Sequence, residues 1–197
     1  MQHDATIYVA GHAGLLGSAV VRRLERDGYR SLITRRRSEL DQRDAGQVSE
    51  FFNEVHPEYV ILAAGRVGGI MENQMFPADF MDENIAIQLN VLKAARRVGV
   101  RRLILFGSSC MYPRECVQPM AEDALLSGKP EPTSLPYAIS KLVGTHLCLA
   151  YNKQDGETRF VPVIPNSAYG PHDNFDPKSA HVLSALMARF HQAKVSG

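Results

Sequence analysis

The sequence predicts an α/β fold, a doubly wound parallel sheet with helices on both faces. Short apolar runs alternate along the 197 residues with longer helical patterns, which is typical of strand, helix, strand units. A glycine-rich turn also follows the first apolar run, and doubly wound sheets bind phosphates at that place. No internal repeat, low-complexity tract or linker interrupts the pattern, so we expect one domain over residues 1–197.

The expected strands are residues 6–10, 31–34, 59–63, 103–106 and 160–164. Each is nearly continuous in apolar residues, as in parallel strands that are buried on both faces. The expected helices are residues 15–27, 45–55, 81–98, 137–153 and 179–193. Residues 65–77 and 113–136 contain Pro and Gly and are predicted to be long functional loops. Right-handed crossovers between these strands favour the strand order 3-2-1-4-5.

Composition excludes several classes of protein. The net charge is +1, and Lys and Arg are spread along the chain, so no basic tract predicts binding to nucleic acid or to a membrane surface. No apolar run approaches the ~18 residues of a membrane span. The three cysteines, Cys110, Cys116 and Cys148, lack CxxC spacing, which argues against a disulfide framework and a metal site. We therefore expect a cytoplasmic protein with reduced thiols and no metal.

The turn after the first strand reads GxxGxxG, with glycines at Gly11, Gly14 and Gly17. The first glycine permits a tight turn, the second lets the backbone approach a pyrophosphate, and the third lets the helix pack close to the strand. Between a strand and a helix, this spacing predicts a Rossmann dinucleotide site, and it is the spacing of short-chain dehydrogenases/reductases.

The end of the second strand indicates which dinucleotide is bound. Arg35, Arg36 and Arg37 stand there, where an acid would bind the ribose 2′-OH of NAD and a cation would bind the 2′-phosphate of NADP. The run favours NADP(H), and the alternative is a solvated arginine run. Asp41 is a candidate acceptor for the adenine amino group, while Asp44 is expected to cap the next helix.

A Tyr and a Lys four residues apart form a second motif, Tyr137 to Lys141. On a helix this spacing places both on one face, where the ammonium should lower the pKa of the phenol and make it a general acid or base. Ser108, Ser109 and Cys110 follow the fourth strand, at the sheet edge where ligands bind. Each motif has a structural alternative, an exposed Tyr and Lys four residues apart on a surface helix or a polar turn after a strand, but the occurrence of the motifs in this order indicates an enzyme.

Eight short stretches occur along the chain in the following order: AGHAGLLGSA, VGGI, PADF, GSSCMYP, PYAISK, YN, YGPHDNF and HV. With them the chain resembles the GDP-L-fucose synthase family of extended short-chain dehydrogenases/reductases over essentially its whole length. The resemblance implies epimerisation of GDP-4-keto-6-deoxy-D-mannose at C3 and C5, followed by reduction at C4 by NADPH. It also implies a homodimer, and a substrate-binding part that begins at about residue 170.

The resemblance further assigns roles to individual residues. For catalysis, Tyr137 would protonate the C4 alkoxide, Lys141 would bind the nicotinamide ribose, Ser108 would polarise the C4 carbonyl, and Cys110 and His181 would be the epimerisation base and acid. The further cofactor residues would be Leu15, Leu16, Ala63, Ala64, Pro165 and His181. The substrate residues would be Val67, Gly68, Gly69, Ser109, Asn166, Asn174 and Lys178.

The chain departs from the family pattern in three ways. Ala13 stands where several members carry Arg, and PNSAYGP at residues 165–171 replaces PTNLYGP. Members also continue well past Gly197 into most of the substrate lobe, so we expect weak or absent turnover from these residues alone. Two alternatives stay open: another sugar-nucleotide epimerase or dehydratase of the same branch, and a catalytically silent nucleotide-binding module.

Overall fold

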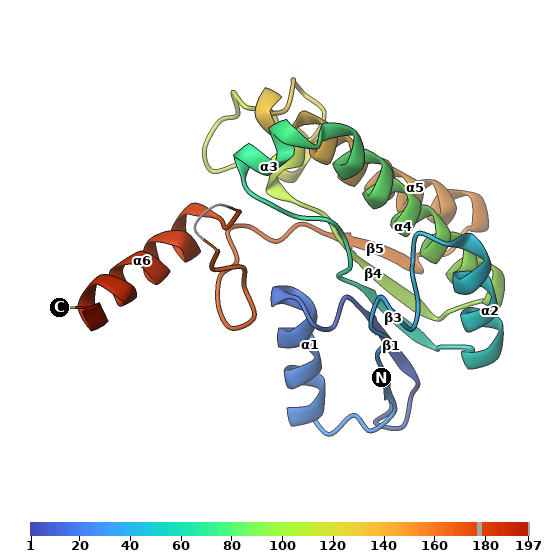
Figure 1. Cartoon of the computed structure of the whole chain (residues 1–197). Coiled ribbons are helices and arrows are strands. Elements are labelled where there is room, and N and C mark those ends of the chain that lie inside the picture. The colour runs from blue at the N-terminus through green and yellow to red at the C-terminus, as the bar shows by residue number, and fades with distance from the viewer. Residues whose placement is uncertain (177–178, 197) are drawn as a thin grey trace.

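A parallel sheet forms the centre of the molecule (Figure 1). The structure is a computed structural model that describes residues 1–176 and 179–196. Within them the sheet has five strands: β1 (Ile7–Ala10), β2 (Leu32–Ile33), β3 (Tyr59–Leu62), β4 (Arg102–Phe106) and β5 (Phe160–Val163). All the pairings are parallel. The predicted fold class is therefore confirmed.

The predicted strand order was wrong. The strands lie in the order β2-β1-β3-β4-β5, so β3 pairs with β1 on the side opposite β2. β2 is only two residues long, and the segment after it is tied to a helix, because Asn90 donates hydrogen bonds to the backbone oxygens of Gln42 and Arg43. The chain then crosses β1 before it forms β3. The point where the crossovers change direction, which is where such folds bind ligands, therefore lies between β1 and β3.

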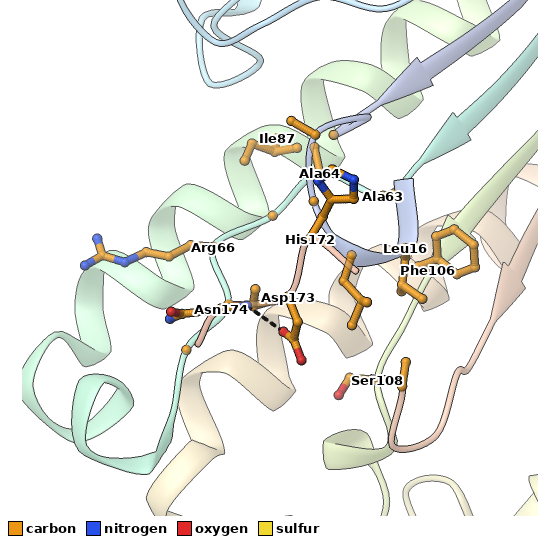
Figure 2. A pocket seen from close by; sticks show the side chains of 18 of the residues that line it. Leu16, Ala63, Ala64, Arg66, Ile87, Phe106, Ser108, His172, Asp173 and Asn174 are labelled. Carbon is orange, nitrogen blue, oxygen red and sulfur yellow. Dashed lines mark hydrogen bonds between the residues drawn. The ribbon is translucent and has the colours of Figure 1, made fainter. Parts of the chain in front are cut away.

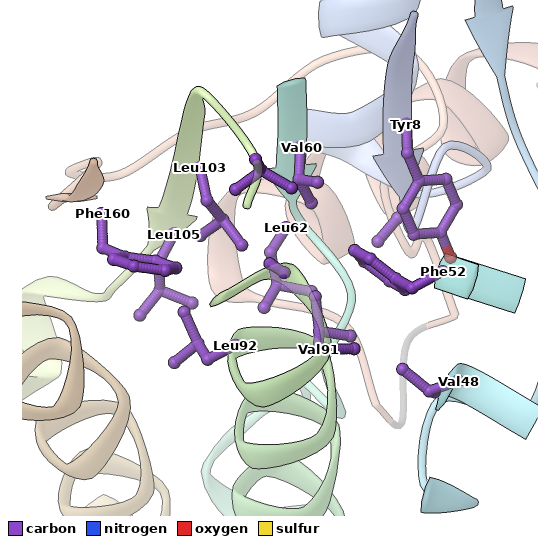
Figure 3. Packing of buried hydrophobic residues seen from close by; sticks show 14 of the residues in the cluster. Tyr8, Val48, Phe52, Val60, Leu62, Val91, Leu92, Leu103, Leu105 and Phe160 are labelled. Carbon is purple, nitrogen blue, oxygen red and sulfur yellow. The ribbon is translucent and has the colours of Figure 1, made fainter. Parts of the chain in front are cut away.

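Helices cover both faces of the sheet. α2 (Ala45–Val55), α4 (Pro77–Val98) and α5 (Leu135–Asp155) lie on one face, and α1 (Leu15–Arg26) lies on the other (Figure 1). Side chains alternate along each strand. Tyr8 and Leu62 accordingly belong to the large core with α2, α4 and α5 (Figure 3), whereas Ile7 and Ile61 pack with Leu24 of α1. Cys148 is fully buried in the large core.

The ends of the helices show which local signals were reliable. Asp44 caps α2 by accepting hydrogen bonds from the backbone N–H groups of Gly46 and Gln47, and the predicted bounds of α2 are confirmed. α4 begins at Pro77 rather than at residue 81, because Pro is favoured at the first helical position. The loop expected at residues 65–77 contains the short helix α3 (Ile70–Met75), which is too short to show an apolar period.

The last helix, α6 (Val182–Ser196), lies to one side of these layers (Figure 1). It begins three residues later than predicted. Large apolar side chains on it are exposed, among them Val182 and Phe190. In the described residues, none of the helices is long and apolar enough to cross a membrane.

Candidate active site

A cavity of about 1190 Å³ opens at the carboxyl ends of β1, β3 and β4. Figure 2 shows Leu16 from the glycine turn, Ala63 and Ala64 after β3, and Ser108 after β4 around it. The predicted site residues that line it are Gly11, Gly14, Leu15, Leu16, Arg35, Arg36, Arg37, Asp41, Ala63, Ala64, Val67, Gly68, Ser108, Ser109, Cys110, Tyr137, Lys141, Pro165, Asn174 and His181. The predicted cofactor, catalytic and substrate residues thus meet in one place.

Some predicted residues do not line this cavity. Gly17 lies behind the turn and serves packing, since a Cβ added there would be 2.1 Å from the backbone oxygen of Gly11. Gly69 donates its backbone N–H to the oxygen of Ser179, which joins the loop after β3 to the segment before α6. The side chain of Asn166 accepts a hydrogen bond from Ser167. Lys178 lies outside the described residues.

The glycine turn brings the backbone close to β3. Gly11 has φ +80°, and a Cβ there would lie 2.6 Å from the backbone nitrogen of Ala64, so a side chain is excluded by both conformation and space. Gly14 is the N-terminal cap of α1 and lines the cavity. The free N–H groups at the start of a helix favour an anion, and this end of the cavity suits a pyrophosphate.

Ser108, Tyr137 and Lys141 gather at the end of β4. The hydroxyl of Ser108 accepts a hydrogen bond from the backbone N–H of Cys110 and also interacts with Tyr137. Lys141 donates from Nζ to the backbone oxygen of Phe106 at 3.1 Å, and its Nζ lies 5.9 Å from the centre of the Tyr137 ring. The Tyr and Lys of α5 and the Ser after β4, which the sequence predicts to act together, therefore lie side by side.

The pKa of Tyr137 does not follow the prediction. Burial raises this pKa from 10.0 to about 12, although the hydrogen bond with Ser108 opposes the change. Burial also lowers the pKa of Lys141 from 10.5 to about 8. The predicted lowering of the phenol pKa was wrong, because loss of water on burial is the largest effect on this pKa. At neutral pH, Tyr137 thus carries a proton that it can donate.

Cys110 and His181 reach the cavity from different segments. Cys110 is half-buried in the short turn Ser109–Met111 after β4, and His181 is exposed immediately before α6. Both line the cavity. An acid and a base on separate segments are what inversion at a carbon atom requires, and their assignment to that role stays a prediction.

The arginine run lines the part of the cavity next to the end of β2, where the adenosine of a dinucleotide is expected. Arg35 donates to the backbone oxygen of Thr34 and lies over the ring of Phe51. Asp41, expected to accept from adenine, is already held by the guanidinium of Arg43, with a shortest N–O distance of 2.6 Å. That hydrogen bonding lowers the pKa of Asp41 to about 2.

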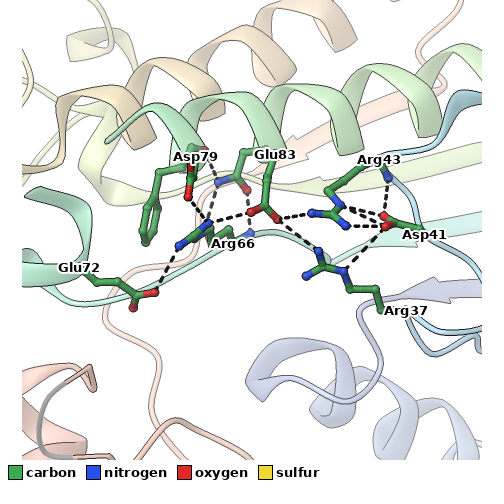
Figure 4. A network of polar contacts seen from close by, with 9 residues as sticks. Arg37, Asp41, Arg43, Arg66, Glu72, Asp79 and Glu83 are labelled. Carbon is green, nitrogen blue, oxygen red and sulfur yellow. Dashed lines mark hydrogen bonds and ion pairs between the residues drawn. The ribbon is translucent and has the colours of Figure 1, made fainter. Parts of the chain in front are cut away.

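Charged residues that were not predicted also line the cavity wall, among them Arg43, Arg66 and Glu83. Arg66 forms ion pairs with Glu72, Asp79 and Glu83 (Figure 4). Two features of the sequence point to this cluster. Arg66 follows β3, at the same sheet edge as Ser108, and residues 79 and 83 are one helical turn apart, so their side chains lie on one face of a helix. The partner acids lie on α3 and α4, and only the folded chain shows that they converge.

Known proteins with similar sequences fit this arrangement of residues. Residues 7–196 match the family described as NAD dependent epimerase/dehydratase. GDP-L-fucose synthase 1 of Arabidopsis thaliana is 48% identical over 194 residues, which are 98% of this chain and 60% of the relative. GDP-L-fucose synthase of Escherichia coli K12 is 46% identical over 95% of this chain and 58% of the relative. The resemblance noted in the sequence is thereby confirmed.

Solved structures agree with these relatives. A GDP-L-fucose synthetase of Naegleria fowleri bound to NADP superposes with a TM-score of 0.91 at 31% identity, over 100% of this chain and 64% of that one. A GDP-6-OMe-4-keto-L-xylo-heptose reductase of Campylobacter jejuni gives 0.94 at 38% identity, over 99% and 56%. The chain spans about 60% of the length of the curated relatives that it matches. The chain therefore belongs to the NAD dependent epimerase/dehydratase family.

Proposed function

We propose that this chain is the cofactor-binding and catalytic part of an NADP(H)-dependent epimerase/reductase that acts on GDP-4-keto-6-deoxy-D-mannose. One observation carries the proposal: a single cavity is lined by the glycine turn, the arginine run, Ser108, Cys110, Tyr137 and Lys141. Relatives at 46–48% identity are GDP-L-fucose synthases, and a solved neighbour is bound to NADP.

The residues present fit NADP(H). The start of α1 at Gly14 offers backbone N–H groups to the pyrophosphate. Arg37 lines the cavity with 66% of its side chain exposed, so its guanidinium can reach a 2′-phosphate. Lys141, at the other end, would bind the nicotinamide ribose. Bound NADPH would supply a hydride to C4 of the sugar.

The reduction depends on a proton that Tyr137 holds. Its pKa of about 12 keeps the phenol protonated at neutral pH, so Tyr137 can donate to the oxygen that develops charge at C4. Ser108 would hydrogen-bond the same oxygen and polarise the carbonyl. Both groups lie at the end of β4 and the start of α5, which fixes them relative to each other.

The epimerisation would use Cys110 and His181. A base removes the proton next to the 4-keto group, an acid returns one to the opposite face, and the enolate oxygen is stabilised by Ser108 and Tyr137. Val67, Gly68 and Asn174 line the same cavity and would contact the sugar.

The proposal is tested by NADPH titration, followed by fluorescence, together with NADPH consumption in the presence of GDP-4-keto-6-deoxy-D-mannose. Exchange of solvent deuterium into C3 and C5 of the sugar reports epimerisation separately. Cys110→Ser should abolish this exchange and leave NADPH binding intact, and Cys116→Ser, outside the cavity lining, should preserve both. NADPH binding without exchange or turnover would favour a silent nucleotide-binding module. Turnover of a different nucleotide sugar would favour another enzyme of the branch.

We further propose that the chain forms a homodimer through α4 and α5. These two helices pack together along their length, and α5 exposes the apolar side chains of Val143 and Leu149. Light scattering at micromolar concentration should give twice the chain mass of 21.8 kDa, and a clean monomer would contradict the proposal.

A further inference from the structure

An ionic network runs along one wall of the cavity, from the arginine run to the loop after β3 (Figure 4). Glu83 of α4 lies at its centre. One carboxylate oxygen, Oε1, accepts from Nη1 of Arg66 at 2.8 Å. The other, Oε2, lies 3.3 Å from Nη1 of Arg43 and 3.9 Å from Nη2 of Arg37. A single side chain thus connects the adenosine side with the loop expected to contact substrate.

The network carries no excess of positive charge. In the part of the chain that the structure describes, it joins the guanidiniums of Arg37, Arg43 and Arg66 to the carboxylates of Asp41, Glu72, Asp79 and Glu83. Three cations against four anions leave a net charge of −1. These seven groups together would therefore repel a phosphate, and within the network attraction requires that a cation leave its carboxylates. Arg35 and Arg36 line the same cavity outside the network.

Of the three cations in the network, Arg37 is the one that can leave. Its guanidinium lies 3.9 Å from both Asp41 and Glu83, too far for a hydrogen bond, and 66% of its side chain is exposed. Arg43, by contrast, is hydrogen-bonded to Asp41 through Nε and Nη2, and Arg66 is bonded to Glu83 and Asp79. Arg37 also follows β2, where a cation would select a 2′-phosphate.

We propose that Glu83 is a specificity-determining residue that weakens the preference of this site for NADP(H) over NAD(H). Its carboxylate competes with the 2′-phosphate for Arg37, and its charge opposes a dianion at the same wall. A pair at 3.9 Å with the Arg37 side chain 66% exposed contributes little to orienting Arg37, so the repulsion outweighs any benefit of holding the side chain. This inference rests on the proposed binding of a dinucleotide.

The test compares the dissociation constants of NADPH and NADH, measured by fluorescence titration at low ionic strength. Glu83→Gln keeps an acceptor for Arg66 and removes the charge. We expect it to bind NADPH about 3–10-fold more tightly and to leave the NADH constant unchanged within about twofold. Asp79→Asn is the matched control, because it removes an equal charge next to Arg66. Within the described residues Asp79 forms no ion pair with Arg37, so this variant should change neither dissociation constant by more than about twofold.

Arg37→Ala completes a double-mutant cycle. In that background the gain from Glu83→Gln should be smaller than in the original chain, because the guanidinium for which the carboxylate competes is absent and only the direct repulsion of the 2′-phosphate is removed. An unchanged or weaker NADPH constant in Glu83→Gln, or an equal gain in Asp79→Asn, would overturn the inference. The NADH constant shows in every variant whether the cavity is intact. If the unsubstituted chain binds neither dinucleotide, the proposed function itself is wrong; if it binds them and Glu83→Gln leaves their ratio unchanged, only the role of Glu83 is wrong.

Discussion

Lys141 on α5 donates a hydrogen bond to the backbone oxygen of Phe106, the last residue of β4, at 3.1 Å. This bond ties α5 to the sheet two residues before Ser108, so the hydroxyl after the strand and the phenol of Tyr137, one turn before Lys141, are held in one frame. The same contact places an ammonium in a buried position, where only 5% of the residue is exposed. Lys141 therefore holds α5 against β4 and at the same time buries its ammonium group. Burial of this charge lowers the stability of the folded chain.

Replacement of Lys141 by Met should stabilise the folded chain at neutral pH. Burial lowers the pKa of Lys141 to about 8 from 10.5, so folding disfavours the charged form. The penalty is complete below pH ~8, shrinks as pH rises toward the unfolded pKa of ~10.4, and is absent above it. Met fills a similar volume without charge, and we expect a gain of about 1–2 kcal/mol at neutral pH after loss of the bond to Phe106.

Urea unfolding near pH 7 and again above the unfolded pKa measures this gain, which should nearly vanish at the higher pH. Lys153→Met, at an exposed position near the end of the same helix, is the control and should change stability little at either pH. A Lys141→Met chain that is less stable than the original at neutral pH would mean that the hydrogen bond to Phe106 outweighs the cost of burial. NADPH binding should weaken in this variant and not in the control.

Two glycines of the turn should differ in what they support. A Cβ at Gly17 would lie 2.1 Å from the backbone oxygen of Gly11, whereas a Cβ at Gly14 would meet that oxygen at an ordinary 3.6 Å. Gly17→Ala should therefore push α1 away from the turn and destabilise the chain by about 2–4 kcal/mol. Gly14→Ala should cost less than about 1 kcal/mol but add a methyl group to the cavity lining.

Urea unfolding combined with NADPH titration distinguishes these two effects. Gly17→Ala should lower both the stability and the affinity, and Gly14→Ala should lower the affinity alone. If Gly17→Ala unfolds at the same urea concentration as the original chain, then α1 does not depend on this close approach. Equal losses of stability in the two variants would contradict the distinction between them.

The sequence predicts the fold and many of the cavity residues because the signals are local. The glycine turn, the apolar strands and Asp44 as a cap each depend on a few adjacent residues. Strand order is not local: it depends on the shortness of β2 and on Asn90, which holds the segment after β2 from α4. The pKa of Tyr137 was missed for the same reason, because spacing reveals a neighbouring Lys but not burial.

The wall that carries Glu83 shows the same limit. Arg66 and Glu83 are 17 residues apart, and Asp41 and Arg43 belong to a segment expected to contact adenine. Each is unremarkable as a charged residue in the sequence. Their convergence comes from the crossing of β1 by the chain after β2 and from α4 lying over the end of β3, and it could be found only in the folded chain.

The loop after β3 depends on one buried amide, that of Asn84. Its Oδ1 accepts from the backbone N–H of Arg66 at 3.1 Å, and its Nδ2 donates to the backbone oxygens of Arg66 and Phe80 at 3.0 and 2.7 Å. Asn84 is 1% exposed, so shortening the side chain leaves these backbone groups without their partners at a buried place. Asn84→Ala should cost about 2–4 kcal/mol and loosen the loop that lines the cavity at Gly65, Val67 and Gly68.

Trypsin gives a local measure of this loosening, because it cleaves after Arg66 only when the loop opens. Cleavage there should accelerate in Asn84→Ala by more than at Arg101, and NADPH affinity should fall with it. Asn53→Ala, at an exposed position on α2, is the matched control and should alter neither. Equal acceleration of cleavage at Arg66 and Arg101 would mean that Asn84 supports the whole domain rather than the loop. Global unfolding exposes both cleavage sites together, whereas opening of the loop alone exposes Arg66 and leaves the β4 end of the sheet protected.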